Sequence, residues 1–340
     1  MTENLVSSVP VPRASDGDWE WRPSLQSRVL GGALRLTMRP LIHRAPSHPV
    51  PIRVARRALD RAAALLPTDR RVRVERVRDP HLRTGHVMRA EWIIPESADD
   101  SGAVLYLHGG GYILCSPQTH RPLTSRVALD TGLPVLAPHY RLAPEHPFPA
   151  ALEDALAAYQ WLLDRGHQKI VIMGDSAGGH LAAGLAGEIT RTGLPEPVGI
   201  VLYSPWVDLL CELSVPHDKQ VRDSFISPFA ARRVGKLVAG LEIDPRLHLL
   251  TADWTALPPV LIQVGGDEVL RPEAEELARL LTAAGGRVDL QIWPGQIHVF
   301  QLLNRLLPDA DEAMRQTATF ITQALTTPDT QPDQGLTVVA

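Results

Sequence analysis

The chain has 340 residues, of which 44% are hydrophobic, so it can bury one large core or two smaller ones. Its formal net charge is -4, with 34 basic and 38 acidic residues, and this balance gives no electrostatic case for a nucleic-acid partner. The arginine-rich segment 53–73 is a local exception. Its helical spacing is typical of a solvated helix face.

Cysteine usage and hydropathy narrow the class of protein further. The only two cysteines, Cys115 and Cys211, are too few for a disulfide framework or a metal cluster, and they fit a reducing compartment. The first 23 residues show no basic region followed by an apolar run, and nothing later approaches 18 uninterrupted apolar residues. We therefore expect a cytoplasmic protein without a membrane span, a bound metal or another cofactor.

The first 69 residues predict a helical layer. Segments 25–41 and 54–66 have apolar residues at helical spacing and arginines on the other face. The polar, proline-containing residues 1–24 before them are expected to be mobile. The N-terminal helices therefore occupy residues 25–69 in this prediction.

From residue 70 the pattern becomes that of strands. Segments 72–77 and 87–94 predict two strands joined by a turn near Asp79 and Pro80. Continuous apolar runs then alternate with mostly helical segments. The apolar runs are 104–107, 135–137, 170–173, 200–203, 260–264 and 288–292. This alternation predicts an α/β fold with a mostly parallel central sheet flanked by helices.

One long interval interrupts the alternation. More than fifty residues separate the strand that ends near residue 203 from the strand that begins near residue 259. Because a structureless loop of that length is improbable in a compact domain, we expect a helical insertion near 206–253. With the N-terminal helices it forms a cap on a domain that spans 70–325. The tail 326–340, rich in Pro, Thr and Gln, is expected to be disordered.

A serine stands between glycines in the run Gly-Asp-Ser-Ala-Gly-Gly at 174–179. The run follows an apolar strand and opens the helix-compatible segment 177–189. Glycines two residues before and two after Ser176 let the backbone bend sharply, so that the hydroxyl stands exposed on a strand-to-helix turn. Ser176 is therefore a candidate nucleophile, which needs a base and an acid to orient that base.

Both partners of the serine are expected after later strands, in the order acid and then histidine. Asp267 follows the strand 260–264 and a pair of glycines, and its neighbour Glu268 is the alternative acid. His298 follows the last strand. Because the carboxyl ends of parallel strands meet at one edge of a sheet, Ser176, Asp267 and His298 are predicted to form a catalytic triad.

Three glycines follow the strand 104–107, in the run His-Gly-Gly-Gly at 108–111. Without side chains, their N–H groups can approach a carbonyl oxygen closely, and each oxyanion-hole donor typically contributes about 3 kcal/mol. A phosphate-binding loop is the alternative, but no GK[ST] or GxGxxG pattern follows. His108 is expected to fix the loop by hydrogen bonding. The candidate oxyanion-hole residues are Gly109, Gly110, Gly111 and Ala177.

These motifs resemble those of the hormone-sensitive-lipase-like family of α/β-hydrolases, bacterial carboxylesterases in particular. The motifs are HGGGY at 108–112, YRLAPEHPFPA at 140–150, GDSAGG at 174–179, GGDEVL at 265–270 and HVF at 298–300. The resemblance covers roughly residues 70–325. It implies an α/β-hydrolase fold, a helical cap and the same triad, with an oxyanion hole from Gly110, Gly111 and Ala177. The segment 140–150 is expected to be scaffold, with Arg141 and Glu145 in ion pairs.

The motifs together predict a carboxylic ester hydrolase that acts on short to medium acyl esters through an acyl-enzyme. A lactone or amide hydrolase with the same triad and an interfacial lipase are alternatives. A non-catalytic small-molecule receptor is a further alternative, which the presence of His298 disfavours. Trp206 and Phe225 are candidates for the substrate pocket. The expected partner is a small-molecule ester, and a homodimer stays open.

Overall fold

The computed structural model describes residues 22–79, 87–99, 101–221, 223–241, 244–255, 257–326 and 336–339. Strands and helices alternate along most of this length. The strands are β1 (Val72–Asp79), β2 (Met88–Pro95), β3 (Ala103–Leu107), β4 (Val135–Pro138), β5 (Ile170–Asp175), β6 (Gly199–Tyr203), β7 (Val260–Gly265), β8 (Val288–Trp293) and β9 (Leu336–Val339). The helices are α1 (Leu25–Arg44), α2 (Pro49–Ala63), α3 (Pro117–Thr131), α4 (Ala150–Asp164), α5 (Ala177–Thr192), α6 (Ser214–His217), α7 (Pro228–Ala239), α8 (Arg271–Ala283) and α9 (Pro308–Thr326), with short 3-10 turns η2 (Pro245–Leu247), η3 (Leu249–Thr251) and η4 (Phe300–Leu303).

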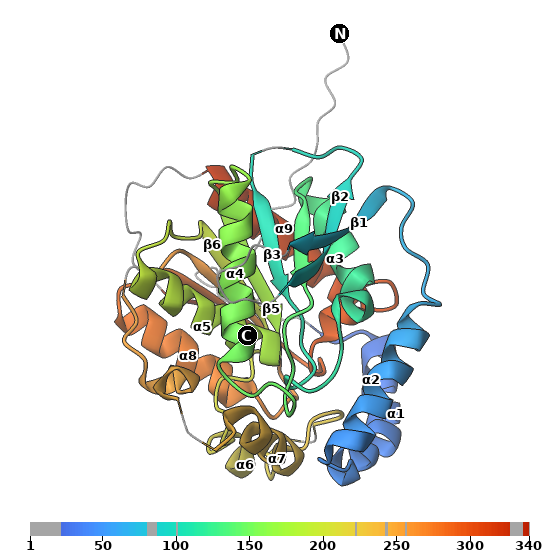
Figure 1. Cartoon of the computed structure of the whole chain (residues 1–340). Coiled ribbons are helices and arrows are strands. Elements are labelled where there is room, and N and C mark those ends of the chain that lie inside the picture. The colour runs from blue at the N-terminus through green and yellow to red at the C-terminus, as the bar shows by residue number, and fades with distance from the viewer. Residues whose placement is uncertain are drawn as a thin grey trace.

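A nine-stranded sheet with the order β1-β2-β4-β3-β5-β6-β7-β8-β9 runs through the centre of the molecule (Figure 1). The β1–β2 and β2–β4 pairs are antiparallel, and all other pairs are parallel. Every residue of β3, β5, β6 and β7 is buried. This is the burial that a parallel sheet covered on both faces requires. The predicted α/β-hydrolase fold is confirmed.

Two hydrophobic layers separate at the sheet because alternate side chains of a strand point to opposite faces. Ile172 of β5 packs in the layer that contains buried residues of α4, α5 and α8. Its neighbour Met173 packs in the opposite layer, with residues of α3 and α9. The helices therefore lie in two layers, one on each face of the sheet (Figure 1).

Four helices gather at one end of the molecule (Figure 1). They are the N-terminal helices α1 and α2 and the helices α6 and α7, which lie between β6 and β7. The insertion is fastened to the catalytic body by buried Glu273 of α8, which accepts hydrogen bonds from the Asp208 backbone N–H and the Ser214 hydroxyl. Burial raises the pKa of Glu273 to about 8. These four helices form the predicted helical cap.

At both ends of the chain, a few residues that were expected to be mobile or disordered take part in regular structure. Ser24, predicted to be mobile, caps α1 by accepting a hydrogen bond from the Ser27 N–H, and its own N–H donates to Asp309. At the other end, Thr326, the first residue of the tail expected to be disordered, is the last residue of α9, and residues 336–339 pair with β8. Residues 1–21, 80–86, 327–335 and 340, which include Pro80 of the predicted turn, lie outside the described residues.

The scaffold role predicted for 140–150 agrees with the ion pairs in the structure. Arg141 binds Asp154 at 2.9 Å and Glu153 at 2.8 Å, both on α4. Glu145 pairs with Arg56 of α2 at 2.9 Å. The segment therefore ties α4 to the sheet and α2 to the catalytic body.

Close packing of α5 against the end of β3 generates a stability prediction. A Cβ added at Gly178 would overlap the carbonyl oxygens of Leu107 and His108, whereas one added at Gly187 of the same helix would meet nothing within 4 Å. Gly178→Ala should therefore lower the free energy of unfolding by about 2 kcal/mol or more. Gly187→Ala, the matched control, should raise it by about 0.5 to 1 kcal/mol through helix propensity. Urea denaturation measures both, and equal stability of the two variants would contradict the packing argument.

Candidate active site

Ser176 lies in a sharp turn between β5 and α5. Its backbone φ is 52°, an unfavourable value for a residue with a side chain. The turn is held because the Ser176 N–H donates to the Tyr203 carbonyl at 2.8 Å, and the Trp206 N–H donates to the Ser176 carbonyl at 3.0 Å. A Cβ at Gly174 would overlap the Gly178 backbone. The predicted need for glycines on either side of Ser176 thus has a steric cause.

His298 reaches Ser176 from the loop after β8. Its Nε2 lies 2.9 Å from the Ser176 Oγ, although the two residues are 122 positions apart in the chain. The next residue, Val299, has a φ of 48°, and its N–H donates to the Ser204 hydroxyl at 3.1 Å. The ring of Phe225 stacks on the imidazole with the centroids 6.2 Å apart. The structure therefore brings the predicted nucleophile and base together in hydrogen-bonding geometry.

The carboxylate that lies behind the histidine is that of Glu268, where the sequence led us to expect Asp267. The Oε2 atom of Glu268 lies 3.4 Å from His298 Nδ1, and the Glu268 side chain is fully buried. Asp267 is exposed on the turn after β7. The turn directs adjacent side chains to opposite sides, and the second of the two carboxylates points inward. Glu268 is the alternative acid that the sequence left open.

Ser204, which the sequence reading missed, connects the acid to the histidine loop. Its hydroxyl donates to Glu268 Oε2 at 2.9 Å and accepts the hydrogen bond from Val299. Ser204 directly follows β6, the strand beside β5 and β7. Its place at the carboxyl end of a central strand was a signal that could have identified it.

The buried carboxylate of Asp223 joins the cap to this acid. It accepts hydrogen bonds from the N–H groups of Phe225 at 2.6 Å, Ile226 at 2.7 Å and Val269 at 2.7 Å. Val269 follows Glu268 directly. Asp223 therefore fixes the segment that carries Phe225 against the turn that carries the acid, while burial raises its pKa.

His298 and Glu268 shift each other's pKa values because an imidazolium and a carboxylate attract each other. Burial acts to lower the pKa of His298, but the neighbouring Glu268 carboxylate, helped by Asp223, raises it above its ordinary value of 6.5. Burial raises the pKa of Glu268, against the opposing effect of His298 and Ser204. By stabilising the protonated form, the site makes the neutral imidazole of His298 a stronger base.

The glycine loop after β3 divides into an anchored residue and two others. The N–H of Gly109 donates to Asp175 at 3.0 Å, so the prediction that Gly109 donates to an oxyanion is corrected. Gly110 and Gly111 have φ values of 106° and 63°. Within the described part of the chain, their N–H groups and that of Ala177 have no hydrogen-bond acceptor.

Asp175, the residue before Ser176, holds that loop in place. It accepts hydrogen bonds from the Tyr106 hydroxyl at 2.7 Å and the Gly109 N–H, and it lies 3.3 Å from His120 of α3. Burial acts to raise its pKa, but His120 and Tyr106 hold the pKa below its ordinary value. A buried anion thus links β3, α3 and the serine turn.

His108 has the structural position expected of it. Its Nδ1 lies 2.7 Å from the Gly109 carbonyl oxygen, and its ring stacks on Tyr140 with the centroids 4.3 Å apart. Burial lowers the pKa of His108 to about 3. A neutral, stacked imidazole at this point fixes the loop.

The two predicted pocket residues have different surroundings. Phe225 is half-buried beside His298, whereas the indole of Trp206 is buried in the core, where its N–H donates to the Asp208 carbonyl at 3.0 Å.

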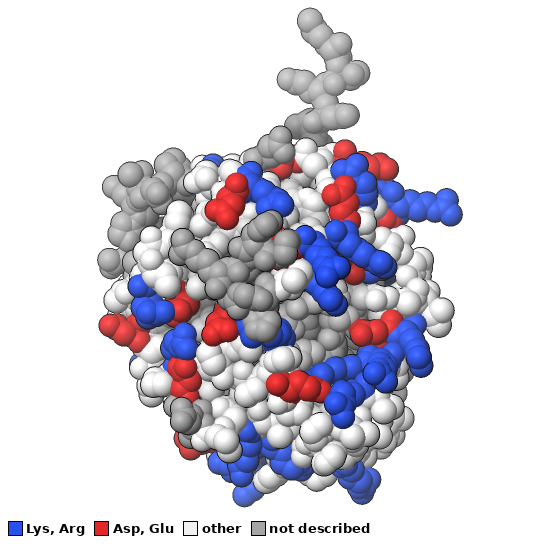
Figure 2. Space-filling model, in the orientation of Figure 1, with Lys and Arg blue, Asp and Glu red and all other residues white. Residues whose placement is uncertain are grey.

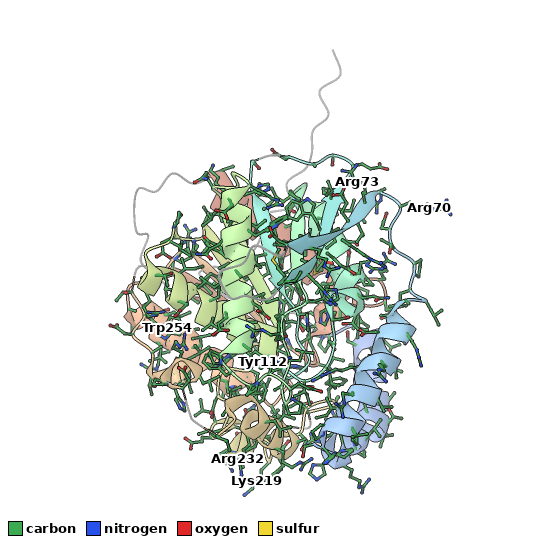
Figure 3. The ribbon with its side chains drawn as sticks, viewed as in Figure 1. Arg70, Arg73, Tyr112, Lys219, Arg232 and Trp254 are labelled. Carbon is green, nitrogen blue, oxygen red and sulfur yellow. The ribbon has the colours of Figure 1, made fainter. Side chains whose placement is uncertain are left out.

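Val234 of α7, which the sequence did not single out, lies close to the glycine loop after β3. A Cβ on Gly111 would be 3.5 Å from the Val234 Cγ1. Tyr112, labelled in Figure 3, follows this loop, and its hydroxyl lies 2.7 Å from His180 Nδ1.

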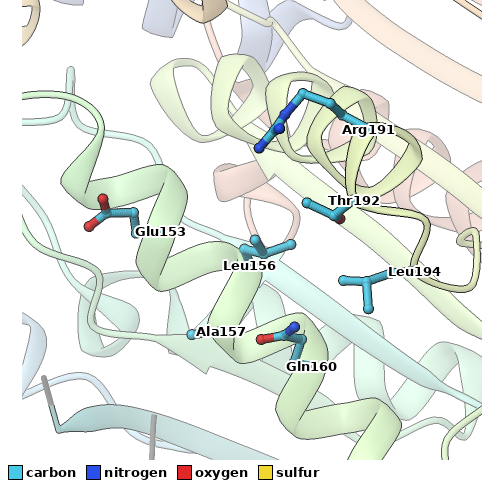
Figure 4. Close-up of a pocket in the computed structure, with 7 residues that line it drawn as sticks. All are labelled: Glu153, Leu156, Ala157, Gln160, Arg191, Thr192 and Leu194. Atoms are coloured by element: carbon cyan, nitrogen blue, oxygen red, sulfur yellow. The ribbon is translucent and has the colours of Figure 1, made fainter. Parts of the chain in front are cut away.

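A separate surface pocket of about 460 Å³ lies between α4 and α5 (Figure 4). Its lining includes Glu153, Gln160 and Arg191, together with Leu156 and Leu194. It contains neither Ser176 nor His298, so it is distinct from the candidate active site. No group of three or more potential metal-ligating side chains occurs among the residues that the structure describes.

Comparison with known proteins agrees with this geometry. Residues 104–302 match the model of a family with the α/β-hydrolase fold. An acetyl-hydrolase of Streptomyces hygroscopicus is 40% identical over 69% of this chain and 80% of its own length. The carboxylesterase/phospholipase LipF of Mycobacterium tuberculosis is 35% identical over 89% of this chain and 83% of its own length. The chain is also similar to the crystal structure of an esterase from the bacterial hormone-sensitive lipase family, with a TM-score of 0.78 and 33% sequence identity. The similarity covers 90% of this chain and 100% of the esterase chain.

The chain therefore belongs to the α/β-hydrolase family that the sequence motifs indicated. Within it, the chain is a serine ester hydrolase of the hormone-sensitive-lipase-like, bacterial carboxylesterase type.

The two adjacent carboxylates allow a matched test of the acid. Glu268→Gln should lower kcat/KM for p-nitrophenyl acetate about a hundredfold or more, because the glutamine cannot offset the imidazolium charge. Since the base must be neutral, wild-type activity should fall as the pH drops through a His298 pKa above 6.5. Glu268→Gln removes the charge that raises this pKa, so the acidic limb should move to lower pH.

Asp267→Asn is the control for this experiment, because it removes one negative charge from the neighbouring, exposed position. It should leave the rate and the acidic limb close to those of the wild type. If Asp267→Asn gives the larger loss, Glu268 is not the acid.

Proposed function

We propose that Ser176, His298 and Glu268 form the catalytic triad of an esterase for short acyl esters. The observation that carries this proposal is the 2.9 Å contact between Ser176 Oγ and His298 Nε2, with the buried Glu268 carboxylate on the other side of the imidazole. A serine hydroxyl is a weak nucleophile unless an adjacent base accepts its proton. The arrangement supplies that base and a charge to stabilise its protonated form.

In acylation, His298 Nε2 takes the hydroxyl proton as the Ser176 oxygen bonds to the ester carbonyl carbon. The carbonyl oxygen of the resulting tetrahedral intermediate becomes an anion. The N–H groups of Gly110, Gly111 and Ala177 are proposed to bind it, which is supported by their lack of acceptors in the described part of the chain. His298 then gives the proton to the departing alcohol, and the carbon–oxygen bond to that alcohol breaks.

In deacylation, His298 takes a proton from water as the water oxygen attacks the acyl carbon. The bond to Ser176 breaks, and the serine oxygen regains the proton from His298 as the carboxylic acid leaves. Glu268 keeps the imidazole in one orientation and offsets its charge in both halves of the reaction. Each cycle therefore consumes one ester and one water and returns the free serine.

A short acyl group is favoured by the side chains next to the reacting atoms. Val234 limits the space beside Gly111, and Phe225 limits the space beside His298. The similarity to an acetyl-hydrolase supports the same substrate class. A panel that compares kcat/KM for esters, lactones and amides of equal acyl length tests the bond preference, with esters expected to be the best substrates.

We also propose that the protein acts in the cytoplasm. Cys115 and Cys211 are both free thiols, which supports a reducing compartment. The homodimer considered from the sequence stays a prediction.

Removing the nucleophile tests the mechanism directly. Ser176→Ala should lower the turnover of p-nitrophenyl acetate about a thousandfold or more, because the variant lacks the hydroxyl on which the acyl-enzyme forms. A fluorophosphonate probe should label the wild type and leave the variant unlabelled, while circular dichroism shows that both are folded. Turnover within about tenfold of the wild type would rule out Ser176 as the nucleophile.

Shortening Val234 tests the limit on acyl length. Val234→Ala should raise the ratio of kcat/KM for p-nitrophenyl hexanoate to that for the acetate several-fold, because a missing methyl pair near Gly111 leaves room for a longer chain; one methylene is typically worth about tenfold in such discrimination. Phe229→Ala on the same helix is the control, since Phe229 is 50% exposed and contacts His43. A ratio that changes equally in both variants would show that Val234 does not set the limit.

A further inference from the structure

The outer surface of the N-terminal helices is apolar where it meets solvent. Leu25, Val29 and Leu36 of α1 are 64%, 63% and 82% exposed. At 100° per residue they lie within about 40° of one another around the helix axis. Val50 and Val54 of α2 are 53% and 61% exposed. Both N-terminal helices thus expose several large aliphatic side chains, which is unusual for a surface that faces only water.

The same two helices carry most of the local positive charge. Residues 25–66 contain eight arginines and one carboxylate, Asp60, in a chain whose net charge is -4. That carboxylate already accepts a hydrogen bond from the Ser116 hydroxyl at 2.6 Å. Arg53, Arg57 and Arg61 are exposed at one-turn intervals on α2, and they form no ion pair with a described residue. The exposed valines of α2 therefore lie beside guanidinium groups without an ion-pair partner among the described residues.

The basic surface continues onto α7, which contacts α1. This helix has Arg232, Arg233 and Lys236 and no acidic residue, and its Phe229 is half exposed. Figure 2 shows Lys and Arg side chains gathered over the end of the molecule where α1, α2 and α7 lie, and Figure 3 labels Arg232 and Lys219 there. We call the exposed side chains of these three helices the cap face.

We infer that the cap face binds peripherally to the surface of a lipid bilayer that contains anionic lipids. Aliphatic side chains that enter the headgroup region, flanked by arginines that meet lipid phosphates, are the combination that interfacial helices use. A nucleic acid would account for the arginines but would leave the leucines and valines without a partner. None of the described helices is long and apolar enough to cross a membrane, so the cap face lies on the bilayer.

Two of the helices that carry the cap face, α1 and α7, also contact loops of the active site. A Cβ added to Gly31 of α1 would be 3.5 Å from Ile297, the residue before His298, and Ser27 donates a hydrogen bond to Gln296 of the same loop at 3.1 Å. Val234 of α7 lies near the oxyanion loop. Docking through this face therefore brings the bilayer to helices that contact the active-site loops. The use of this contact in ester hydrolysis rests on the proposed function, whereas the binding itself does not.

Vesicle co-sedimentation of the full chain tests the inference without turnover. The protein should bind vesicles of phosphatidylcholine mixed with phosphatidylglycerol, bind pure phosphatidylcholine vesicles weakly, and dissociate as salt is raised. Each basic residue near an anionic surface contributes about a fivefold factor, so Arg53→Gln/Arg57→Gln/Arg61→Gln should lower the partition coefficient at least tenfold. Arg73→Gln/Arg76→Gln/Arg78→Gln is the matched control, with the same charge change on exposed residues of β1 at the other end of the molecule. It should bind like the wild type.

A second variant separates a bilayer from a polyanion. Leu36→Ser/Val54→Ser changes two exposed side chains, so the fold should be retained, while vesicle binding should fall about fivefold or more and binding to single-stranded RNA should not change. The inference is overturned if the wild type does not bind anionic vesicles, if both arginine triples lose binding equally, or if the Leu36 and Val54 double variant binds vesicles normally. Hydrolysis of dissolved p-nitrophenyl acetate by the same proteins reports separately on the proposed function.

Discussion

The arrangement of the active site depends on one buried carboxylate, that of Asp175. It sits at the end of the central strand β5, where it binds the Tyr106 hydroxyl, the Gly109 N–H and, at 3.3 Å, His120. An anion in such a dry place is costly unless hydrogen bonds and a nearby cation compensate for lost water. Because those compensating groups come from β3, the glycine loop and α3, the requirement to satisfy Asp175 aligns the glycine loop with the serine turn.

A second buried carboxyl group, that of Glu273, attaches the cap through hydrogen bonds. Glu273 accepts hydrogen bonds from the Asp208 N–H and the Ser214 hydroxyl. Because its pKa is raised to about 8, little negative charge is buried under the insertion at neutral pH. Asp223 fixes the next segment against the turn that carries Glu268. The insertion is thus hydrogen-bonded at two points, Val269 and Glu273, to the segment that follows Glu268. The cap therefore helps to fix the turn that carries Glu268.

Much of the fold followed from the sequence because its physical signals are local. Continuous apolar runs and their alternation with helices predicted the parallel sheet, and Ser176 and His298 were identified by the strands that they follow. The choice between Asp267 and Glu268 was different. Neighbours on one turn share every sequence signal, and only the path of the turn, where Gly266 packs against Pro294, decides which one points inward.

Two other features were out of reach for a related reason. Gly109 lies in the glycine run that predicts oxyanion donors, but its N–H donates a hydrogen bond to Asp175, 66 positions away in the chain. Ser24 was assigned to a mobile segment from the polar, proline-containing composition of residues 1–24, which gives no sign of its partner Asp309, 285 residues away. Periodicity and spacing describe a residue's own element, so contacts made across the whole chain are invisible to them.

The partners of α1 also have a consequence for how the chain acquires its structure. Ser24 and Ser27 bond to Gln296 and Asp309, at separations of 269 to 285 residues. During synthesis from the N-terminus, the beginning of α1, with Ser24 and Ser27, therefore lacks these partners until nearly the whole hydrolase body has left the ribosome. Closing so long a loop delays the contact further, since local contacts form first. The beginning of α1 is thus made long before its hydrogen-bond partners, and until they are made its exposed leucine and arginine side chains are free to contact other surfaces.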